Sequence, residues 1–393
     1  MSQLRYFCST IKKDSNMHKI LVFCPSVAGH RLEYLHHLYN GALCFNSKTY
    51  IFMVTTDFYT VKNKFLWTDA PNVGIVDIPS TIIQKFKGNI LSSSYNKCKY
   101  LGQAVDKYKP DQVIVLDMIE YVPFLPFFVS SKANVSGIIY RIFLYEYNKE
   151  PLIKKVLDKF KYWWMNYFGV YDKVFILNDK SSSEKLNKMF NSSKFRYLPD
   201  PVVPIENLEE FNIRQQYSIP KETYVLLHPG GMLPYKGTID ILRGLCLLTE
   251  EARKDITVIF AGRVTESIKN EFDILCEEVK KKVQIIVEEG FLPYERLGAL
   301  IKQSDWLLIP YKTKSQSSGI VGHAAYFEKP VIAVKGGLIG NIVSQYNLGI
   351  LIEESTPECI YKAILDLNSR PVCKNSYCEA NTIDNFVSKI ICS

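Results

Sequence analysis

A glycine pair and a lysine in the second half of the chain have the composition of a phosphate-binding turn. The stretch HPGGMLPYKGTIDILRGL places Gly230 and Gly231 after an apolar run of strand type, and Lys236-Gly237 where a helical pattern begins. Free backbone amides at a helix N-terminus, together with a lysine ammonium, form a site of diphosphate size. The order G-x-x-x-x-G-K-[ST] of a Walker loop is absent. The alternative is an ordinary strand, turn and helix with a surface lysine.

A second candidate anion site opens another expected helix. Ser317, Ser318 and Gly319 begin the run SGIVGHAAYFE, and Gly322 and His323 follow one turn later. Small residues there allow a charged ligand to approach the backbone amides closely. A plain N-cap by either serine is the alternative, and the two roles can coexist.

The glycines after the next expected strand resemble a dinucleotide-binding pattern only weakly. Gly336, Gly337 and Gly340 come late in the domain, and the acidic residue expected about 20 positions further on is missing. We therefore discount NAD as a ligand.

Polar residues also follow strands in the first half of the chain. Gly29 and His30 lie where the first strand meets its helix, so Gly29 can present backbone amides and His30 is expected to point into a cleft. A structural histidine is the alternative at such a position. Further candidates follow later strands of this half: Asp117, Glu120, Tyr140, Arg141 and Glu146. Asp200 is either a turn former or a cleft residue.

These residues are positioned by an alternation of strands and helices. The first half predicts a strand in the run MHKILVFCPS, which opens at Met17, and further strands over 50–56, 112–117, 137–143 and 173–178. It predicts helices over 31–43, 92–107, 152–167 and 181–190. The second half predicts strands over 224–230, 256–262, 283–289, 306–311 and 330–334, and helices over 237–248, 265–281, 294–304 and 318–328. This alternation predicts an α/β protein with two doubly wound, Rossmann-like domains.

The segment LPDPVVPIENLEE separates the two series of strands and helices. We predict a disordered extension over 1–16, a first domain over 17–199, a hinge over 200–222, a second domain over 223–375, and a C-terminal helix over 376–393 that packs back on the first domain. Ligands of open parallel sheets bind beyond the carboxyl ends of the strands, so a ligand is expected in a cleft between the two domains.

Composition narrows the class of protein. The 393 residues are 47% hydrophobic and 13% aromatic, which excludes a wholly disordered or fibrous chain. No apolar run is long enough to span a bilayer, and the N-terminus has no apolar signal core, so a cytoplasmic location is expected. The ten cysteines include no C-x-x-C pair and indicate reduced, structural thiols.

The basic charge is concentrated in the first half. Residues 1–200 contain 27 Lys and Arg against 16 Asp and Glu, whereas residues 201–393 contain 21 against 24. Within the first half, 151–168 interleaves lysines with tryptophans and other aromatics, a pattern that predicts peripheral contact with an anionic membrane. The alternative is a helix with a buried aromatic face and solvated lysines. No nucleic-acid motif accompanies the charge, so no nucleic-acid partner is expected.

Taken together, these motifs resemble the GT-B glycosyltransferases, in particular the retaining family 4 (glycosyl transferases group 1). The likeness is best over 224–365 and looser over 19–200, where LPDPVV matches the family's I-P-N-G-V-D hinge only loosely. Gly230 and Lys236-Gly237 match a G-R-L-x-x-x-K-G element. Further matches, in order, are Gly290, Phe291, Leu297, Ser304-Asp305 through Pro310, Lys329 through Ala333, and Gly336-Gly337.

The sequence departs from the family at three charged positions. The family's paired glutamates fall on Ser315 and His323, and the arginine of G-R-L falls on Gly231. In the family the first glutamate lies near the donor sugar, the second commonly holds the ribose, and the arginine and lysine neutralise the diphosphate. Of these charged positions only the lysine is kept, as Lys236. The resemblance leads to two hypotheses: His323 hydrogen-bonds the ribose in place of the second glutamate, and Arg263 supplies part of the missing positive charge.

The resemblance implies a site made of residues from both halves. The catalytic candidates are Lys236 and His30, and His30 would orient the acceptor or the donor sugar. The donor-binding candidates are Gly29, Gly230, Gly231, Lys236, Arg263, Phe291, Ser317, Ser318, Gly319, Ile320 and His323. No D-x-D metal motif occurs, so a metal-independent reaction without a cofactor is expected.

The activity implied is transfer of a hexose-type sugar from a nucleotide diphosphate sugar to a glycan or lipid-linked acceptor, with retention, in polysaccharide or glycoconjugate synthesis. Two alternatives stay open at this point. One is a catalytically degenerate GT-B protein that only binds nucleotide sugars, because one cation lost from a leaving-group site costs several kcal/mol of transition-state stabilisation. The other is a nucleotide-sugar epimerase, which needs no separate acceptor.

Overall fold

The computed structural model describes residues 17–26, 30–56, 58, 67–68, 70–129, 132–145, 150–205, 207–249, 256–367 and 376–392. The predicted extension over 1–16, Gly29 and Glu146 lie outside these residues. The chain divides into two compact units. Unit 1 comprises Met1–Ile142, Lys149–Pro199 and Ile383–Ser393, and unit 2 comprises Phe143–Asn148 and Asp200–Thr382.

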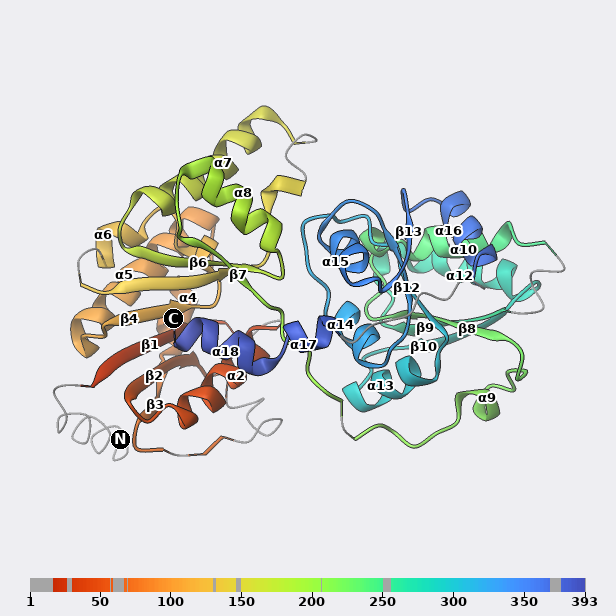
Figure 1. Cartoon of the computed structure of the whole chain (residues 1–393), viewed down its shortest axis with the longest axis horizontal. Coiled ribbons are helices and arrows are strands. Elements are labelled where there is room, and N and C mark those ends of the chain that lie inside the picture. Colours follow the sequence, from red (N-terminus) through yellow and green to blue (C-terminus); the bar gives the residue numbers. More distant parts are fainter. Residues whose placement is uncertain are drawn as a thin grey trace. The chain divides into compact units, whose positions relative to one another are not determined.

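Unit 1 is built on a seven-stranded sheet in the order β3-β2-β1-β4-β5-β6-β7, with every strand pair parallel (Figure 1). Its strands are β1 His18–Cys24, β2 Lys48–Thr55, β3 Val73–Ile78, β4 Gln112–Val115, β5 Asn134–Ile139, β6 Tyr171–Leu177 and β7 Phe195–Leu198. The central strand β1 is apolar, and Ile20 through Phe23 are fully buried, because helices cover both faces of the sheet.

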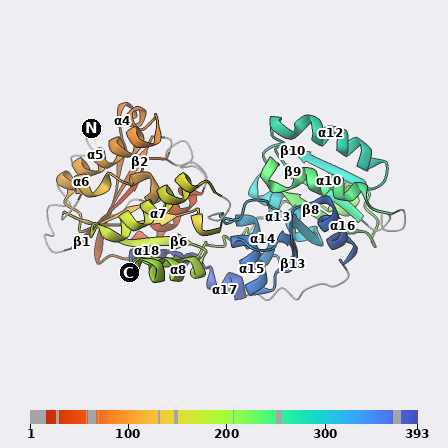
Figure 2. The same cartoon turned by 90° about the horizontal axis from the view of Figure 1, so that it is seen from above.

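The helices of unit 1 lie on both sides of this sheet, with α4, α5 and α6 on one side and α8 and α18 on the other (Figure 2). They are α2 Arg31–Cys44, α4 Ser80–Lys85, α5 Ile90–Tyr108, η3 Met118–Tyr121, α6 Leu125–Val129, α7 Leu152–Tyr167, α8 Lys180–Phe190 and α18 Ile383–Ile391. The C-terminal helix α18 packs against α2, and its residues Phe386 and Ile390 are fully buried in the core of this unit.

Unit 2 contains a six-stranded parallel sheet in the order β10-β9-β8-β11-β12-β13. The strands are β8 Tyr224–Pro229, β9 Ile256–Gly262, β10 Gln284–Glu289, β11 Trp306–Ile309, β12 Val331–Val334 and β13 Gly349–Ile352. The helices are η4 Phe143–Tyr145, α9 Ile213–Gln216, η6 Pro234–Lys236, α10 Thr238–Cys246, α12 Glu266–Lys280, α13 Tyr294–Gln303, α14 Gly319–Tyr326, α15 Leu338–Tyr346, α16 Pro357–Leu365 and α17 Ser376–Ala380. The predicted α/β class is therefore confirmed.

Both sheets reverse their strand order at one point. In unit 1 the chain runs from β1 outward to β3 and returns to β4 on the other side of β1, and in unit 2 it runs from β8 to β10 and returns to β11. The carboxyl ends of the two strands at such a switch point diverge and leave room for a ligand. The residues after β1, β4, β8 and β11 therefore lie where each unit has room for a ligand.

Three predicted segments differ from the structure. The strand expected over 137–143 is β5, and residues 143–148 belong instead to unit 2, where Asn341 Nδ2 donates to Tyr145 Oη at 3.0 Å. The segment 200–222 is part of unit 2 and includes α9. The segment 376–393 forms two helices, of which α17 belongs to unit 2 and α18 to unit 1.

Candidate active site

His228, at the carboxyl end of β8, ties that strand to β11 and to α10. Its Nδ1 lies 2.7 Å from the Leu308 carbonyl oxygen, and its Nε2 lies 2.9 Å from Thr238 Oγ1. The side chain is fully buried, and burial lowers its pKa to about 4. The ring is therefore neutral at pH 7, with Nδ1 donating to the carbonyl and Nε2 accepting from the hydroxyl. This pair of bonds fixes the N-terminus of α10 against the sheet.

Glycine is required in the turn between β8 and α10. Gly230 and Gly237 have φ values of 89° and 76°, in the left-handed region that side chains disfavour. A Cβ atom on Gly237 would lie 2.6 Å from the Pro310 carbonyl oxygen. The turn therefore brings the first turn of α10 into contact with the end of β11, as the glycine motif requires.

Lys236 places a positive charge at this switch point, and none of the described residues forms an ion pair with it. Its Nζ lies 5.0 Å from the centroid of the Tyr311 ring, within the range of a cation–π contact. Burial lowers the pKa of the ammonium, and no carboxylate of the described residues acts on it. The neighbouring Lys312 is different, because its Nζ pairs with Asp240 at 2.6 Å. Lys236 is thus a partly buried cation whose counter-charge has to come from elsewhere.

The N-terminus of α14 lies next to Tyr311. Ser318 occupies the N-cap position with no side-chain cap bond, and Ser317 Oγ donates to Asp200 Oδ2 at 2.9 Å. Burial raises the pKa of Tyr311 to about 12, an effect that the neighbouring Ser318 side chain partly offsets. Tyr311 therefore links Lys236 to the start of α14, and Asp200 contacts the serine loop directly.

The switch point of unit 1 contains a cluster of paired charges. Arg31 donates through Nη2 to Asp117 Oδ2 at 2.7 Å and to Glu120 Oε1 at 2.8 Å, and Lys97 Nζ lies 2.8 Å from Glu120 Oε2. Burial, helped by the charge of Glu120, raises the pKa of Asp117 to about 6. Burial also opposes ionisation of Glu120, but Arg31 and Lys97 together lower its pKa. Asp117 is thus the carboxyl group of this cluster that exchanges a proton near neutral pH.

His30 immediately precedes this cluster. Its side chain is 58% exposed, and its Nδ1 lies 3.5 Å from Glu33 Oε2. The ring stacks on Tyr34 with centroids 6.1 Å apart. An exposed imidazole at a switch point is accessible to a ligand.

Comparison with known proteins assigns the family. Residues 209–383 match the model of the glycosyl transferases group 1. This region is a glycosyl transferases group 1 domain, and the chain has the GT-B fold. No curated protein sequence matches the chain. The resemblance predicted from the sequence motifs is confirmed.

Solved structures share this fold over nearly the whole chain. A glycosyltransferase from Rickettsia africae matches with a TM-score of 0.64 and 16% identity, covering 95% of this chain and 97% of that one. WaaG, a glycosyltransferase involved in lipopolysaccharide biosynthesis, matches with a TM-score of 0.60, 14% identity and 95% coverage of each chain. Anabaena HepE, in complex with UDP and glucose, matches with a TM-score of 0.61, 13% identity and 95% coverage of each chain. At such identities the likeness establishes the fold alone.

The predicted donor-binding residues of this glycosyltransferase divide into two groups. Gly230, Gly231, Lys236, Ser317, Ser318, Gly319 and Ile320 lie in the loops and first turns that follow β8 and β11. Three others follow different elements: Arg263 is exposed after β9, Phe291 is 86% exposed after the edge strand β10, and His323 is half-buried on α14, 6.0 Å from the Tyr294 ring. Within the described part of the chain, no contact joins the side chains of Arg263 or Phe291 to Lys236.

Sequence reasoning missed three residues that organise the site. Tyr311 was predicted only as the end of a strand, yet it carries Lys236 on its ring and borders a pocket lined by Lys314 and Gly336. His228 was part of the glycine motif without a role. Arg31 follows His30 and pairs with both carboxylates of the switch-point cluster, Asp117 and Glu120. In the described segments, no group of three His, Cys, Asp or Glu side chains could hold a metal ion.

Proposed function

We propose that this glycosyltransferase transfers a hexose-type sugar from a nucleoside diphosphate sugar bound by unit 2 to a glycan or lipid-linked acceptor. The observation that carries the proposal is Lys236. A partly buried ammonium without a carboxylate is costly for an empty protein, and a diphosphate supplies the missing negative charge. The uncapped amides at the start of α14 add favourable dipoles for the same anion.

The proposed reaction needs no residue to form a covalent intermediate. The acceptor hydroxyl oxygen forms a bond to the anomeric carbon while the bond from that carbon to the phosphate oxygen breaks. The hydroxyl proton passes to the departing phosphate oxygen on the same face of the sugar, so the anomeric configuration is retained. Lys236 lowers the barrier because it stabilises charge that grows on the diphosphate as the bond breaks. We propose that no metal ion takes part.

The cluster in unit 1 is proposed to orient the acceptor together with His30. Its charges are paired with one another, which suits a neutral hydroxyl ligand better than an anion. Asp117 accepts a hydrogen bond from a hydroxyl when ionised, and its raised pKa makes that state dependent on pH near 6. We propose that unit 1 binds the acceptor and that the reaction belongs to polysaccharide or glycoconjugate synthesis.

A thermal-shift screen against UDP, GDP, ADP and CMP, with and without EDTA, tests the donor site. UDP is the first choice because HepE, which has the same fold, was solved with UDP. A nucleotide at a hundred times its Kd adds about 2.7 kcal/mol to the free energy of unfolding. We expect one nucleoside diphosphate to raise the melting midpoint equally with and without EDTA, and Lys236→Ala to lose the shift. A shift that disappears with EDTA would contradict the metal-independent proposal.

Product analysis then separates the proposal from its alternatives. Incubation with the matching sugar nucleotide and an acceptor panel should give a glycoside whose anomeric configuration, read by NMR coupling constants, equals that of the donor. A second sugar nucleotide formed without acceptor would identify an epimerase. Nucleotide binding without any product would identify a degenerate site.

A further inference from the structure

Helix α7 carries an apolar surface that the rest of unit 1 leaves uncovered. Seven large side chains point outward, and Ile153 and Val156 are 76% and 60% exposed. At 3.6 residues per turn the seven fall within one arc of about 140°. They are Leu152, Ile153, Val156, Leu157, Phe160, Trp163 and Tyr167. We call this set the α7 apolar arc.

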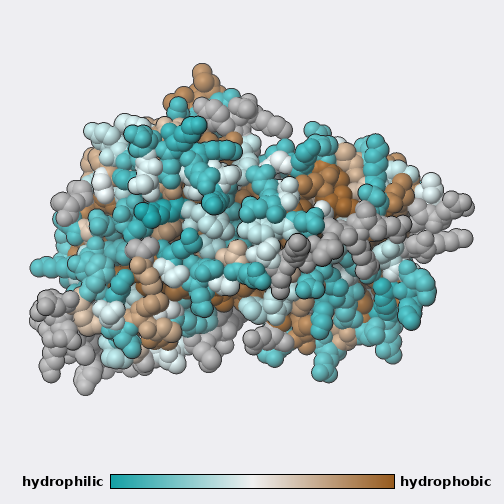
Figure 3. All heavy atoms as spheres, viewed as in Figure 1, coloured by the Kyte–Doolittle hydropathy of each residue, from teal (hydrophilic) through white to brown (hydrophobic). Residues whose placement is uncertain are grey.

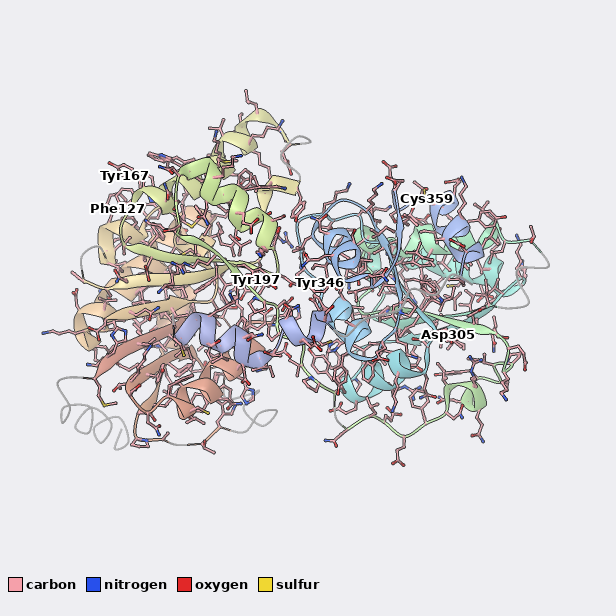
Figure 4. The ribbon with its side chains drawn as sticks, in the orientation of Figure 1. Phe127, Tyr167, Tyr197, Asp305, Tyr346 and Cys359 are labelled. Atoms are coloured by element: carbon pink, nitrogen blue, oxygen red, sulfur yellow. The ribbon has the colours of Figure 1, made fainter. Side chains whose placement is uncertain are left out.

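The figures place the arc at the outer edge of its unit. Figure 3 shows hydrophobic side chains gathered at the top of unit 1, where Figure 1 draws the first turns of α7. Phe127 of α6 extends the surface, because its ring lies 6.3 Å from Trp164. Phe127 and Tyr167 are both 67% exposed and lie at the same edge of the unit in Figure 4.

The opposite side of α7 is held firmly against unit 1. Tyr162 and Met165 on that side are buried. Trp164 lies at the margin of the arc next to Leu157, and its Nε1 donates to the Pro123 carbonyl at 2.9 Å. Lys194 Nζ donates to the Asn166 and Phe168 carbonyls at 2.9 and 2.7 Å, so it caps the C-terminal end. The helix therefore presents its apolar arc outward in a fixed orientation. The predicted alternative of a buried aromatic face holds for Tyr162, whereas Trp163 and Tyr167 are exposed.

Lysines border the arc on both sides. On the same helical spacing, Lys155 and Lys159 flank one margin and Lys154 and Lys161 flank the other. Two of these lysines have acidic partners: Lys161 pairs with Asp158, the only acidic residue of the helix, at 3.0 Å, and Lys154 pairs with Glu150 just before the helix. Apolar side chains between two rows of lysines match the surface of a bilayer with anionic headgroups. The apolar side chains can contact the acyl chains while the lysines contact the phosphates.

We propose that α7 docks unit 1 onto an anionic lipid bilayer, with the apolar arc inserted below the headgroups and the lysines at headgroup level. Charge complementarity favours this occupant over a second copy of the chain, because a two-fold contact between two arcs would bring their lysine borders together. No helix among the described residues is long and apolar enough to cross a membrane, so the proposed contact is peripheral. The proposal concerns a surface separate from the nucleotide site and stands independently of it.

Co-sedimentation of the full chain with lipid vesicles tests the proposal. We expect binding to vesicles of phosphatidylcholine mixed with phosphatidylglycerol, and little binding to phosphatidylcholine alone. The double variant Ile153→Ser with Val156→Ser should weaken binding at least about tenfold, because two exposed side chains lose their insertion into hydrocarbon. Replacing Lys154, Lys155, Lys159 and Lys161 by Gln should weaken binding by up to several hundredfold, at about fivefold per lysine.

Matched controls use equally exposed residues of unit 2. Ile274→Ser removes a side chain that is 61% exposed on α12, and Lys302→Gln removes an exposed lysine of α13. Neither change should affect vesicle binding. Retention of the nucleotide-induced thermal shift shows that the α7 variants are folded, and if no nucleotide binds, an unchanged melting midpoint serves the same purpose.

Three results would overturn the proposal. They are absence of sedimentation with anionic vesicles at low salt, sedimentation that the α7 variants leave unchanged, and lipid-independent dimerisation in analytical ultracentrifugation that Val156→Ser abolishes. The last result would assign the arc to a second copy of the chain.

Discussion

Replacing Lys236 by methionine should affect stability and ligand binding in opposite directions. In the protein without ligand, burial disfavours the ammonium, and no carboxylate of the described residues offsets this cost. Methionine has a similar length, fills the same space beside Gly230, and keeps a favourable sulfur contact with the Tyr311 ring. The cation–π contact is lost, but relief of desolvation should leave a net gain of about 1 kcal/mol in the free energy of unfolding.

The same substitution should weaken nucleoside diphosphate binding. A hydrogen bond to a charged group contributes about 1.5–3 kcal/mol, so the Kd should rise about ten- to a hundredfold. Differential scanning fluorimetry measures both effects in one experiment. Without ligand the melting midpoint should rise by about 2–4 °C, and the further rise caused by UDP should fall or vanish. Calorimetric titration gives the Kd directly.

Lys312→Met is the matched control for the stability half of this prediction. Lys312 pairs with Asp240, which is 8% exposed and otherwise accepts a bond from Ser355 Oγ at 3.1 Å. Removing Lys312 leaves that carboxylate with less compensation and should lower stability by about 1–3 kcal/mol. If Lys236→Met lowered the stability of the ligand-free protein in the same way, Lys236 would be a structural cation, and the argument from its missing partner would be refuted.

Substitutions of other residues at the two switch points give further predictions. The pKa of His228 is about 4 in the folded chain and about 6.5 in the unfolded chain. Its contribution to the free energy of unfolding is therefore complete above pH 6.5 and declines by about 1.4 kcal/mol per pH unit as pH falls towards 4. In His228→Gln, the free energy of unfolding measured with urea should depend less steeply on pH over this range. The kcat/KM for the acceptor should rise as pH increases through about 6, because Asp117 accepts the hydroxyl hydrogen bond when ionised. Asp117→Asn should remove this step from the plot of kcat/KM against pH. Gly237→Ala should cost at least about 2 kcal/mol in urea unfolding, because φ is positive and Pro310 lies in the way, whereas Gly169→Ala, whose Cβ meets nothing within 4 Å, should stay within about 0.5 kcal/mol.

Hydrophobic patterning was sufficient to predict the central strands and most helices. Parallel strands buried on both faces appear as apolar runs, so β1, β8 and β9 are visible in the sequence. The outer strands β3, β7 and β13 were not predicted. Two of them have only four residues, too few to show a period, and their formation depends on a neighbouring strand that the sequence does not identify.

The candidate site was predictable where its chemistry is local, and not where it depends on strand order. Gly230, Lys236 and Gly237 belong to one turn, so their spacing alone indicates an anion site. Tyr311 lies 75 positions from Lys236 and reaches it only because β11 pairs with β8. The bond from Ser317 to Asp200 spans 117 positions and depends in the same way on tertiary packing.

The two switch points differ in how their charges are satisfied, and this difference supports a division of roles. In unit 2, no carboxylate among the described residues acts on Lys236, so an external anion can compensate its charge. In unit 1, Arg31 and Lys97 already hold both carboxylates, so an incoming charged ligand would have to break existing pairs. A neutral hydroxyl can instead add a hydrogen bond to the cluster at little cost. The charge pattern therefore supports the diphosphate donor in unit 2 and the hydroxyl acceptor in unit 1.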